Sequence, residues 1–225
     1  MIMSEIKKET RELGEFHKIT VKGMGKILLK QGSPQEVTVE AEEHVLSRIK
    51  TDVIDGCLII DIGRDWLEKL TAGLDYLSSR NIIFDITMKK LDALEVAGGC
   101  SIEASEFKGK ELILDLSGAS SVEFEDINYD VIKSNLPGAG KLAMDGKVKE
   151  QFISLTGAGS YIADDLESEK THISLTGVGS ARLWVKDELD AAITGVGTIE
   201  YYGEPQIKQS IAMMGSIRSL GKKIT

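Results

Sequence analysis

The 225-residue chain has only 3 prolines, 2 cysteines and 2 tryptophans. Cys57 and Cys100 are too few and too isolated for a disulfide framework or a zinc site, so both are expected to be small buried hydrophobes. No apolar run approaches the roughly 20 residues of a transmembrane helix, and the first residues lack the apolar segment of a signal peptide. As written, the chain is expected to be cytoplasmic, without membrane insertion.

Basic residues are also in the minority, and the net charge is −9 at pH 7. This charge would repel a phosphate backbone and an anionic bilayer, so no nucleic-acid partner is expected. The histidines His17, His44 and His172 are scattered without metal-ligand spacing, and no nucleophile or acid–base motif surrounds them. The sequence therefore predicts no catalytic residues, no cofactor and no metal site.

Glycine, in contrast, is abundant, with 23 residues, and many of them recur at regular spacing. In segments such as Ile173–Leu183, apolar residues or glycines alternate with other residues, which is typical of a β-strand. Such segments recur every 18 to 20 residues, and a seventh repeat lies near position 213. A further isolated one contains Gly23 and Gly25. The first glycines of the other six are Gly98, Gly118, Gly138, Gly157, Gly177 and Gly195.

The alternation also assigns a side to these glycines. Residues two apart on a strand share a face, so the paired glycines lie on the face that carries Ile, Leu and Val. Glycine is needed where a sheet bends sharply or two backbones approach closely, so each is assigned to an inner corner. A coil of about 20 residues can hold two or three short strands and stack about 4.8 Å from the next. The sequence thus predicts an all-β, parallel right-handed β-helix-like solenoid, with an antiparallel sandwich or barrel as the alternative.

The chain is divided into an amino-terminal β region, residues 1–92, and the glycine repeats, residues 93–221, which together form one continuous structural unit. Within the first region, Glu36–Glu40 and Val53–Ile60 are candidate strands, and Asp55-Gly56 predicts a hairpin turn.

Apolar residues at helical spacing after Asp65 predict one helix over about residues 65–79. This helix could cover an open sheet edge or dock a partner. Its apolar residues are Trp66, Leu67, Leu70, Leu74 and Leu77.

Several segments in a fixed order resemble the head GIN domain family of proposed auto-transporter adhesins. They are the opening Phe16–Ile27, the repeats beginning at Leu116, Leu155 and Ile193, and the closing Gly197–Pro205. The resemblance spans about residues 14–220. It implies a β-helix-like fold, a prokaryotic exported or surface protein with an adhesive role, and no catalytic residues.

If the glycines face inward, the residues between them face outward as a column of small apolar side chains flanked by Ser and Thr. This column, called the contact stripe below, has three interpretations. It is a tight outer corner, a surface for an oligomer or ligand, or part of a water-organising hydroxyl array. Its candidate contact residues are Ala119, Ala139, Ala158, Val178, Val196 and Met214.

Acidic turns recur near Asp126, Asp145, Asp164 and Asp187. Stacked carboxylates could bind Ca²⁺, but the calcium-roll motif is absent and Asp is itself a favoured turn residue. The predicted function is a non-enzymatic scaffold or adhesion-type binding module that self-associates or binds a surface glycan or protein. The alternative, a β-helix that binds or cleaves polysaccharide, would need acidic and basic groups converging on one outward face.

Overall fold

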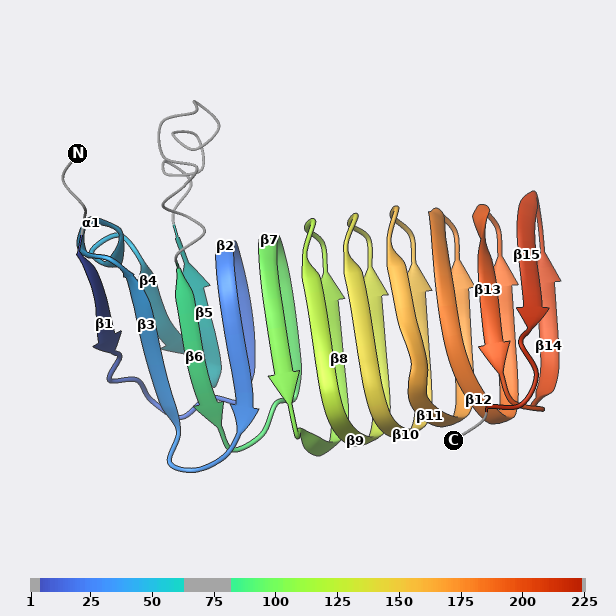
Figure 1. The fold of residues 1–225 in the computed structure, drawn as a ribbon, viewed down its shortest axis with the longest axis horizontal. Helices are drawn as coiled ribbons and strands as arrows, with labels where there is room; N and C mark the ends of the chain where they lie inside the picture. The colour runs from blue at the N-terminus through green and yellow to red at the C-terminus, as the bar shows by residue number, and fades with distance from the viewer. Residues whose placement is uncertain (1–4, 63–81, 224–225) are drawn as a thin grey trace.

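The computed structural model describes residues 5–62 and 82–223, and these form a β-solenoid whose coils stack side by side along the long axis (Figure 1). The described helix α1 spans Glu43–Leu46, and no described helix is long and apolar enough to cross a membrane. The helix predicted over residues 65–79 lies outside the described residues. The strands are β1 (Ile6–Thr10), β2 (Lys18–Gln31), β3 (Glu36–Glu42), β4 (Lys50–Ile54), β5 (Cys57–Asp61), β6 (Ile83–Met88), β7 (Ala93–Ser105), β8 (Lys108–Leu116), β9 (Ser121–Leu136), β10 (Lys141–Leu155), β11 (Ser160–Leu175), β12 (Val178–Ile193), β13 (Val196–Tyr202), β14 (Gln206–Ile211) and β15 (Met214–Ser219).

Each coil in the middle of the solenoid is one long strand that bends halfway, rather than two or three separate short strands. β9 to β12 have 15 or 16 residues each and pair in parallel with their neighbours. The bends coincide with irregular backbone, such as Asp126 at φ 50° and Gly146 at φ 120°. The segments that follow a glycine turn form sheet 1, and those that lead into the next glycine turn form sheet 2. This parallel pairing excludes the antiparallel sandwich.

The first glycine of each turn lies against the backbone of the preceding coil. A Cβ on any of the six would lie 1.9 to 2.2 Å from the carbonyl oxygen of the preceding coil's first glycine. The same carbonyl oxygen also accepts a hydrogen bond from the residue that follows the first glycine of the next turn. For example, the Val178 amide, which follows Gly177, donates to the Gly157 carbonyl at 3.0 Å. Close approach of backbones along the solenoid axis is therefore why glycine is needed there. None of the six is exposed: Gly98, Gly118, Gly138, Gly157 and Gly177 are half-buried and Gly195 is buried.

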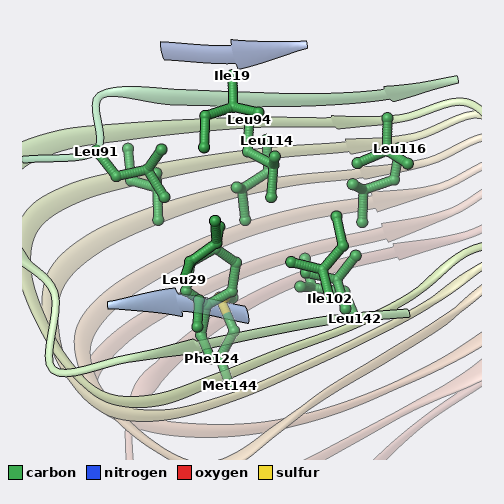
Figure 2. Packing of buried hydrophobic residues seen from close by; sticks show 14 of the residues in the cluster. Ile19, Leu29, Leu91, Leu94, Ile102, Leu114, Leu116, Phe124, Leu142 and Met144 are labelled. Carbon is green, nitrogen blue, oxygen red and sulfur yellow. The ribbon is translucent and has the colours of Figure 1, made fainter. Parts of the chain in front are cut away.

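The core fills the space between the two sheets with the alternate side chains of every coil. Figure 2 shows Leu114 and Leu116 of sheet 2 opposite Ile102 and Phe124 of sheet 1. Residues at equivalent positions of successive coils stack in columns. Leu116, for example, is followed in its column by Leu136, Leu155 and Leu175. The resulting apolar stack is continuous from the amino-terminal region to Ile199 and supplies most of the stabilisation.

The amino-terminal region belongs to the same solenoid. β2 is its first complete coil and pairs directly with β7, with Gly23 opposite Gly98. Residues 32–92 are therefore an insertion between two stacked coils. They add β6 and the antiparallel β3 and β1 to sheet 1, and the hairpin of β4 and β5 to sheet 2. The predicted turn of that hairpin is confirmed, with Asp55 and Gly56 both at positive φ.

Candidate functional site

A groove of about 630 Å³ runs across β8 to β12 on the outer face of sheet 2. Its lining is mainly apolar, although it lies on the solvent side of the sheet. We call it the sheet 2 groove. It is lined by Ile113, Leu114, Asp115, Lys133, Ser134, Asn135, Phe152, Ile153, Ser154, His172, Ile173, Ser174, Asp190 and Ala192.

The strand register places the outward side chains of this groove in two parallel rows. The first row contains the larger residues and the second, two positions further along each strand, contains the smaller ones. The alternation of strands puts both rows on the same face. The first row is Ile113, Lys133, Phe152, His172 and Asp190, and the second is Asp115, Asn135, Ser154, Ser174 and Ala192. The second row thus forms a low floor beside a higher wall.

Aromatic rings form the centre of the wall. Phe152 and His172 lie on adjacent coils, and their rings stack with centroids 4.9 Å apart at an interplanar angle of 9°. Phe152 is still 38% exposed, and Ile113 in the same row is 44% exposed. Two large apolar side chains that remain this open on a sheet face mark a surface suited to contact with another molecule.

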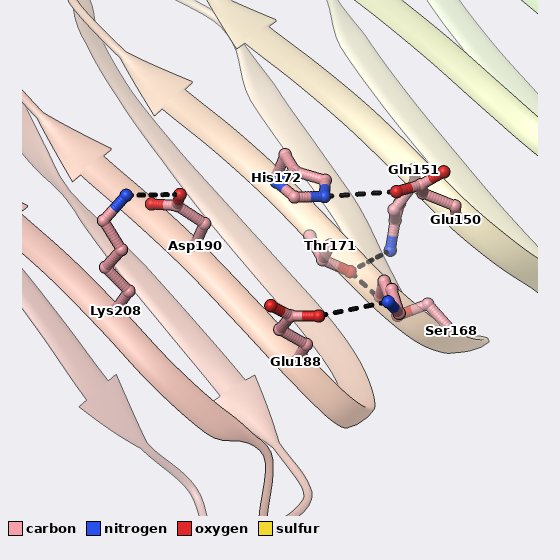
Figure 3. Close-up of polar contacts among 9 residues, drawn as sticks. Glu150, Gln151, Ser168, Thr171, His172, Glu188, Asp190 and Lys208 are labelled. Atoms are coloured by element: carbon pink, nitrogen blue, oxygen red, sulfur yellow. Dashed lines mark hydrogen bonds and ion pairs between the residues drawn. The ribbon is translucent and has the colours of Figure 1, made fainter.

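The charged groups around the groove are paired with one another across coils. His172 Nε2 lies 3.3 Å from Glu150 Oε1, and Asp190 accepts from Lys208 Nζ at 3.2 Å (Figure 3). Lys133 Nζ lies 2.6 Å from Glu111 Oε1. These pairs are exposed and add little stability, but they hold the long side chains along the rows.

The floor presents hydrogen-bonding groups in fixed positions. Asn135 Nδ2 donates to Asp115 Oδ2 at 3.1 Å, which leaves the Asn135 carbonyl oxygen with a defined direction. Ser154 and Ser174 follow on the next two coils. The groove therefore combines the exposed apolar side chains of Ile113 and Phe152 in its wall with a row of amide, carboxylate and hydroxyl groups on its floor, as sites for small polar ligands do.

A polar cluster lies beneath this face, inside the solenoid. Tyr161 Oη donates to Gln151 Oε1 at 2.7 Å. Figure 3 shows that Gln151 Nε2 in turn donates to Thr171 Oγ1 at 3.0 Å and that Thr171 shares a hydrogen bond with Ser168. All four residues are buried, and burial raises the pKa of Tyr161. Because these groups satisfy one another, the cluster supports β10 and β11 without offering a site.

The contact stripe lies on the turns, away from the sheet 2 groove. All six of its residues are exposed, with Val178 at 63% and Met214 at 75%. A shallow groove of about 640 Å³ follows the stripe and its flanking serines. A contact role for Ala119, Ala139, Ala158, Val178, Val196 and Met214 stays a prediction.

The acidic turns and the histidines do not assemble into a metal site. No group of three or more His, Cys, Asp or Glu side chains in residues 5–62 and 82–223 could hold a metal ion. Instead, Asp145 accepts a hydrogen bond from the Asp126 amide at 2.7 Å, and Asp164 pairs with Arg182 at 3.6 Å. Cys100 is buried, and burial raises its pKa to about 11.

Sequence reasoning missed the sheet 2 groove. Its signal was present as apolar residues at outward positions of the repeat, Ile113 and Phe152, where other coils carry Lys133 and Asp190. Phe152 and His172 are neighbours because the strand register stacks positions about 20 residues apart.

Comparisons with known proteins identify the family from the sequence and the fold from solved structures. The sequence profile of the family described as "Putative auto-transporter adhesin, head GIN domain" matches residues 15–205. A crystal structure described as a putative adhesin from Bacteroides fragilis has a TM-score of 0.88 at 20% identity, over 96% of this chain and 97% of the other. One described as a putative lipid binding protein from Parabacteroides distasonis has a TM-score of 0.71 at 20% identity, over 96% of both chains. No curated protein sequence matches the chain.

Proposed function

Because the chain belongs to the auto-transporter adhesin head GIN domain family, we propose that it is a non-enzymatic, adhesion-type binding module that holds a glycan chain in the sheet 2 groove. The observation that carries this proposal is the exposed Phe152 ring beside the polar floor of Asn135 and Ser154. A sugar ring has apolar C–H faces and equatorial hydroxyls, so it can stack on the wall while its hydroxyls bond to the floor.

The shape of the groove supports a glycan over a lipid. One structural relative is described as a lipid binding protein, but an acyl chain gains its binding energy by leaving water on all sides. The sheet 2 groove is an open depression on a sheet face, so one side of an acyl chain would stay hydrated. An extended glycan lying along the solenoid axis would instead meet a new floor residue at each coil, about every 4.8 Å.

A glycan array tests the proposal directly. The wild-type protein should bind a subset of the immobilised glycans, and Phe152→Ala should weaken that binding about 5- to 30-fold, because losing an aromatic anchor costs about 1 to 2 kcal/mol. Val178→Ala, at an exposed site on the contact stripe, is the matched control and should bind like wild type. Equal binding by Phe152→Ala and wild type, or binding to lipid vesicles in place of glycans, would contradict the proposal.

The non-enzymatic part has its own measurement. Each bound glycan is incubated with the protein and analysed for shorter products. We expect the glycan to be recovered intact, because the charged groups of the groove are paired in rows and do not converge on one bond. Release of sugar fragments would instead support the carbohydrate-cleaving alternative.

A further inference from the structure

The carboxyl-terminal end of the solenoid is open. β14 pairs with β12 and β15 pairs with β13, each in parallel, and neither has a ladder partner on its other side within the described residues. β14 and β15 are the last strands of the two sheets in Figure 1. Each therefore presents a row of backbone N–H and C=O groups that can pair with another strand.

The core continues into this last coil without being covered. Ile207 and Ile211 stand in register with Leu189 and Ile193, which are 0% and 1% exposed. Ile207 and Ile211 themselves are 41% and 45% exposed. Ile217, in register with the buried Ile199, is half-buried. The inner face of the last coil thus carries Ile207, Ile211 and Ile217, with Gln209 at the inward position between the first two, and it lies between two strand edges that have no ladder partner within the described residues.

A partner must satisfy both edges and also cover the apolar surface between them. A single extended peptide would pair with one edge only. A bilayer would remove water from the unpaired backbone groups without replacing their hydrogen bonds. A second carboxyl-terminal end supplies two strand edges and the same apolar surface.

The amino-terminal end of another copy fits less well. There the apolar residues Val45 and Leu46 of α1 and the neighbouring Ile49 are already buried at 1%, 2% and 4% exposure. The large exposed hydrophobics of that end are Ile6 and Ile54. A head-to-tail contact would therefore leave most of the open end's apolar surface unmatched.

The charges at the open end also permit two copies to meet. Residues 206–223 carry four basic side chains and no acidic one. Each of the four is paired with a carboxylate outside this segment, so like charges need not repel strongly across the contact. The pairs are Lys208 with Asp190, Arg218 with Glu200, Lys222 with Glu204 and Lys223 with Asp165.

We propose that two copies of the chain join tail to tail through β14 and β15 around a two-fold axis. β14 and β15 run in opposite directions within one copy. A two-fold axis perpendicular to the solenoid axis places β14 of one copy against either β14 or β15 of the other, and the facing strands are antiparallel in both cases. Ile207, Ile211 and Ile217 of the two copies then form a shared core. Each end of the dimer is then an amino-terminal region whose apolar residues Val45, Leu46 and Ile49 are already buried, so we expect assembly to stop at two, and both sheet 2 grooves stay open.

Sedimentation of the wild-type chain tests this over concentrations from about 1 μM to about 1 mM, the range of ordinary association constants. We expect a monomer–dimer equilibrium without larger species. The double variant Ile207→Lys/Ile211→Lys should weaken association at least about 100-fold, because it places charge in the shared core. The controls Ile54→Lys, at the opposite end, and Val178→Lys, on the contact stripe, should dimerise like wild type.

Hydrogen exchange on the wild-type chain gives a readout that does not depend on the fold of a variant. Amides of β14 and β15 should exchange more slowly as concentration rises, while those of β1 and β4 should not change. A monomer over the whole range, open-ended assemblies or loss of the dimer in Ile54→Lys would overturn the proposal. Loss of the dimer in Val178→Lys would overturn it in favour of the stripe. These outcomes do not depend on glycan binding.

Discussion

The two ends of this solenoid solve the same problem differently. At the amino-terminal end, residues 32–62 turn back over the first coil, and Leu46 and Ile49 close the core. In the last described coil at the carboxyl-terminal end, Ile207 and Ile211 are exposed in columns that are buried one coil earlier. Stacking builds the body of a solenoid from a repeat, but ending it requires residues outside the repeat.

The corner glycines also differ between the interior of the solenoid and its last coil. Replacing them by alanine should give the largest difference in unfolding free energy. A Cβ at Gly98 of β7 would lie 1.9 Å from the backbone oxygen of Gly23 of β2, whereas one at Gly215 in the last coil would first meet the Ile193 side chain at 2.6 Å. Gly98→Ala should therefore lower the free energy of unfolding by more than about 3 kcal/mol, and Gly215→Ala by a smaller amount of about 1 to 2 kcal/mol.

Gly99→Ala is the matched control for this pair in a chemical denaturation series. A Cβ at Gly99 would have only ordinary contacts with the Met24 side chain, at 3.8 Å. The variant should be neutral or slightly stabilising, because alanine reduces the freedom of the unfolded chain. Equal destabilisation by Gly98→Ala and Gly99→Ala would show that the backbone contact is not what requires glycine.

We expect an effect of intermediate size when an apolar side chain is truncated at each end and the losses of unfolding free energy are compared. Leu46→Ala removes a side chain that is 2% exposed in the cap and should cost about 2 to 4 kcal/mol in unfolding free energy. Ile211→Ala, at 45% exposure, should cost less than about 1 kcal/mol when the chain is dilute. Thermal unfolding of both variants measures the difference, and a larger loss for Ile211→Ala would mean that the end is covered.

The smallest effect concerns charge at the open end. A hydrogen bond from the Arg218 guanidinium lowers the pKa of Glu200 below its ordinary value of 4.5. A carboxyl whose pKa is lowered on folding adds stability above its ordinary pKa, and that stability is lost as the pH falls through the folded pKa. Arg218→Gln should raise the pKa of Glu200, as an NMR titration of its carboxyl carbon would show. An unchanged pKa would assign the shift to other groups.

The coil could be predicted from the sequence because the inward-facing residues recur both at every second position and about every twenty residues. The alternation of two marks the inner face, and the spacing of about twenty marks the stacked coils, so Leu116, Leu136, Leu155 and Leu175 could be aligned without coordinates. The hairpin at Asp55-Gly56 was predictable because its turn requires positive φ at both residues.

Other features depend on contacts that no local pattern records. The pairing of β2 with β7 spans an insertion of about sixty residues, so Gly23 and Gly98 could not be recognised as stacked neighbours. The sheet 2 groove depends on side-chain sizes in adjacent coils, and Phe152 alone looks like any apolar strand residue. The open end was not predictable because Ile207 and Ile211 have the pattern of buried columns, and only the described structure shows that they are exposed.

Native-state hydrogen exchange in dilute solution tests the difference between the two ends most directly. If one end is closed and the other open, amides of β14 and β15 should exchange at least about 100-fold faster than those of β3 and β6, with β9 to β11 slowest of all. Comparable protection of β14, β15 and β3 in a chain shown to be monomeric would contradict this account.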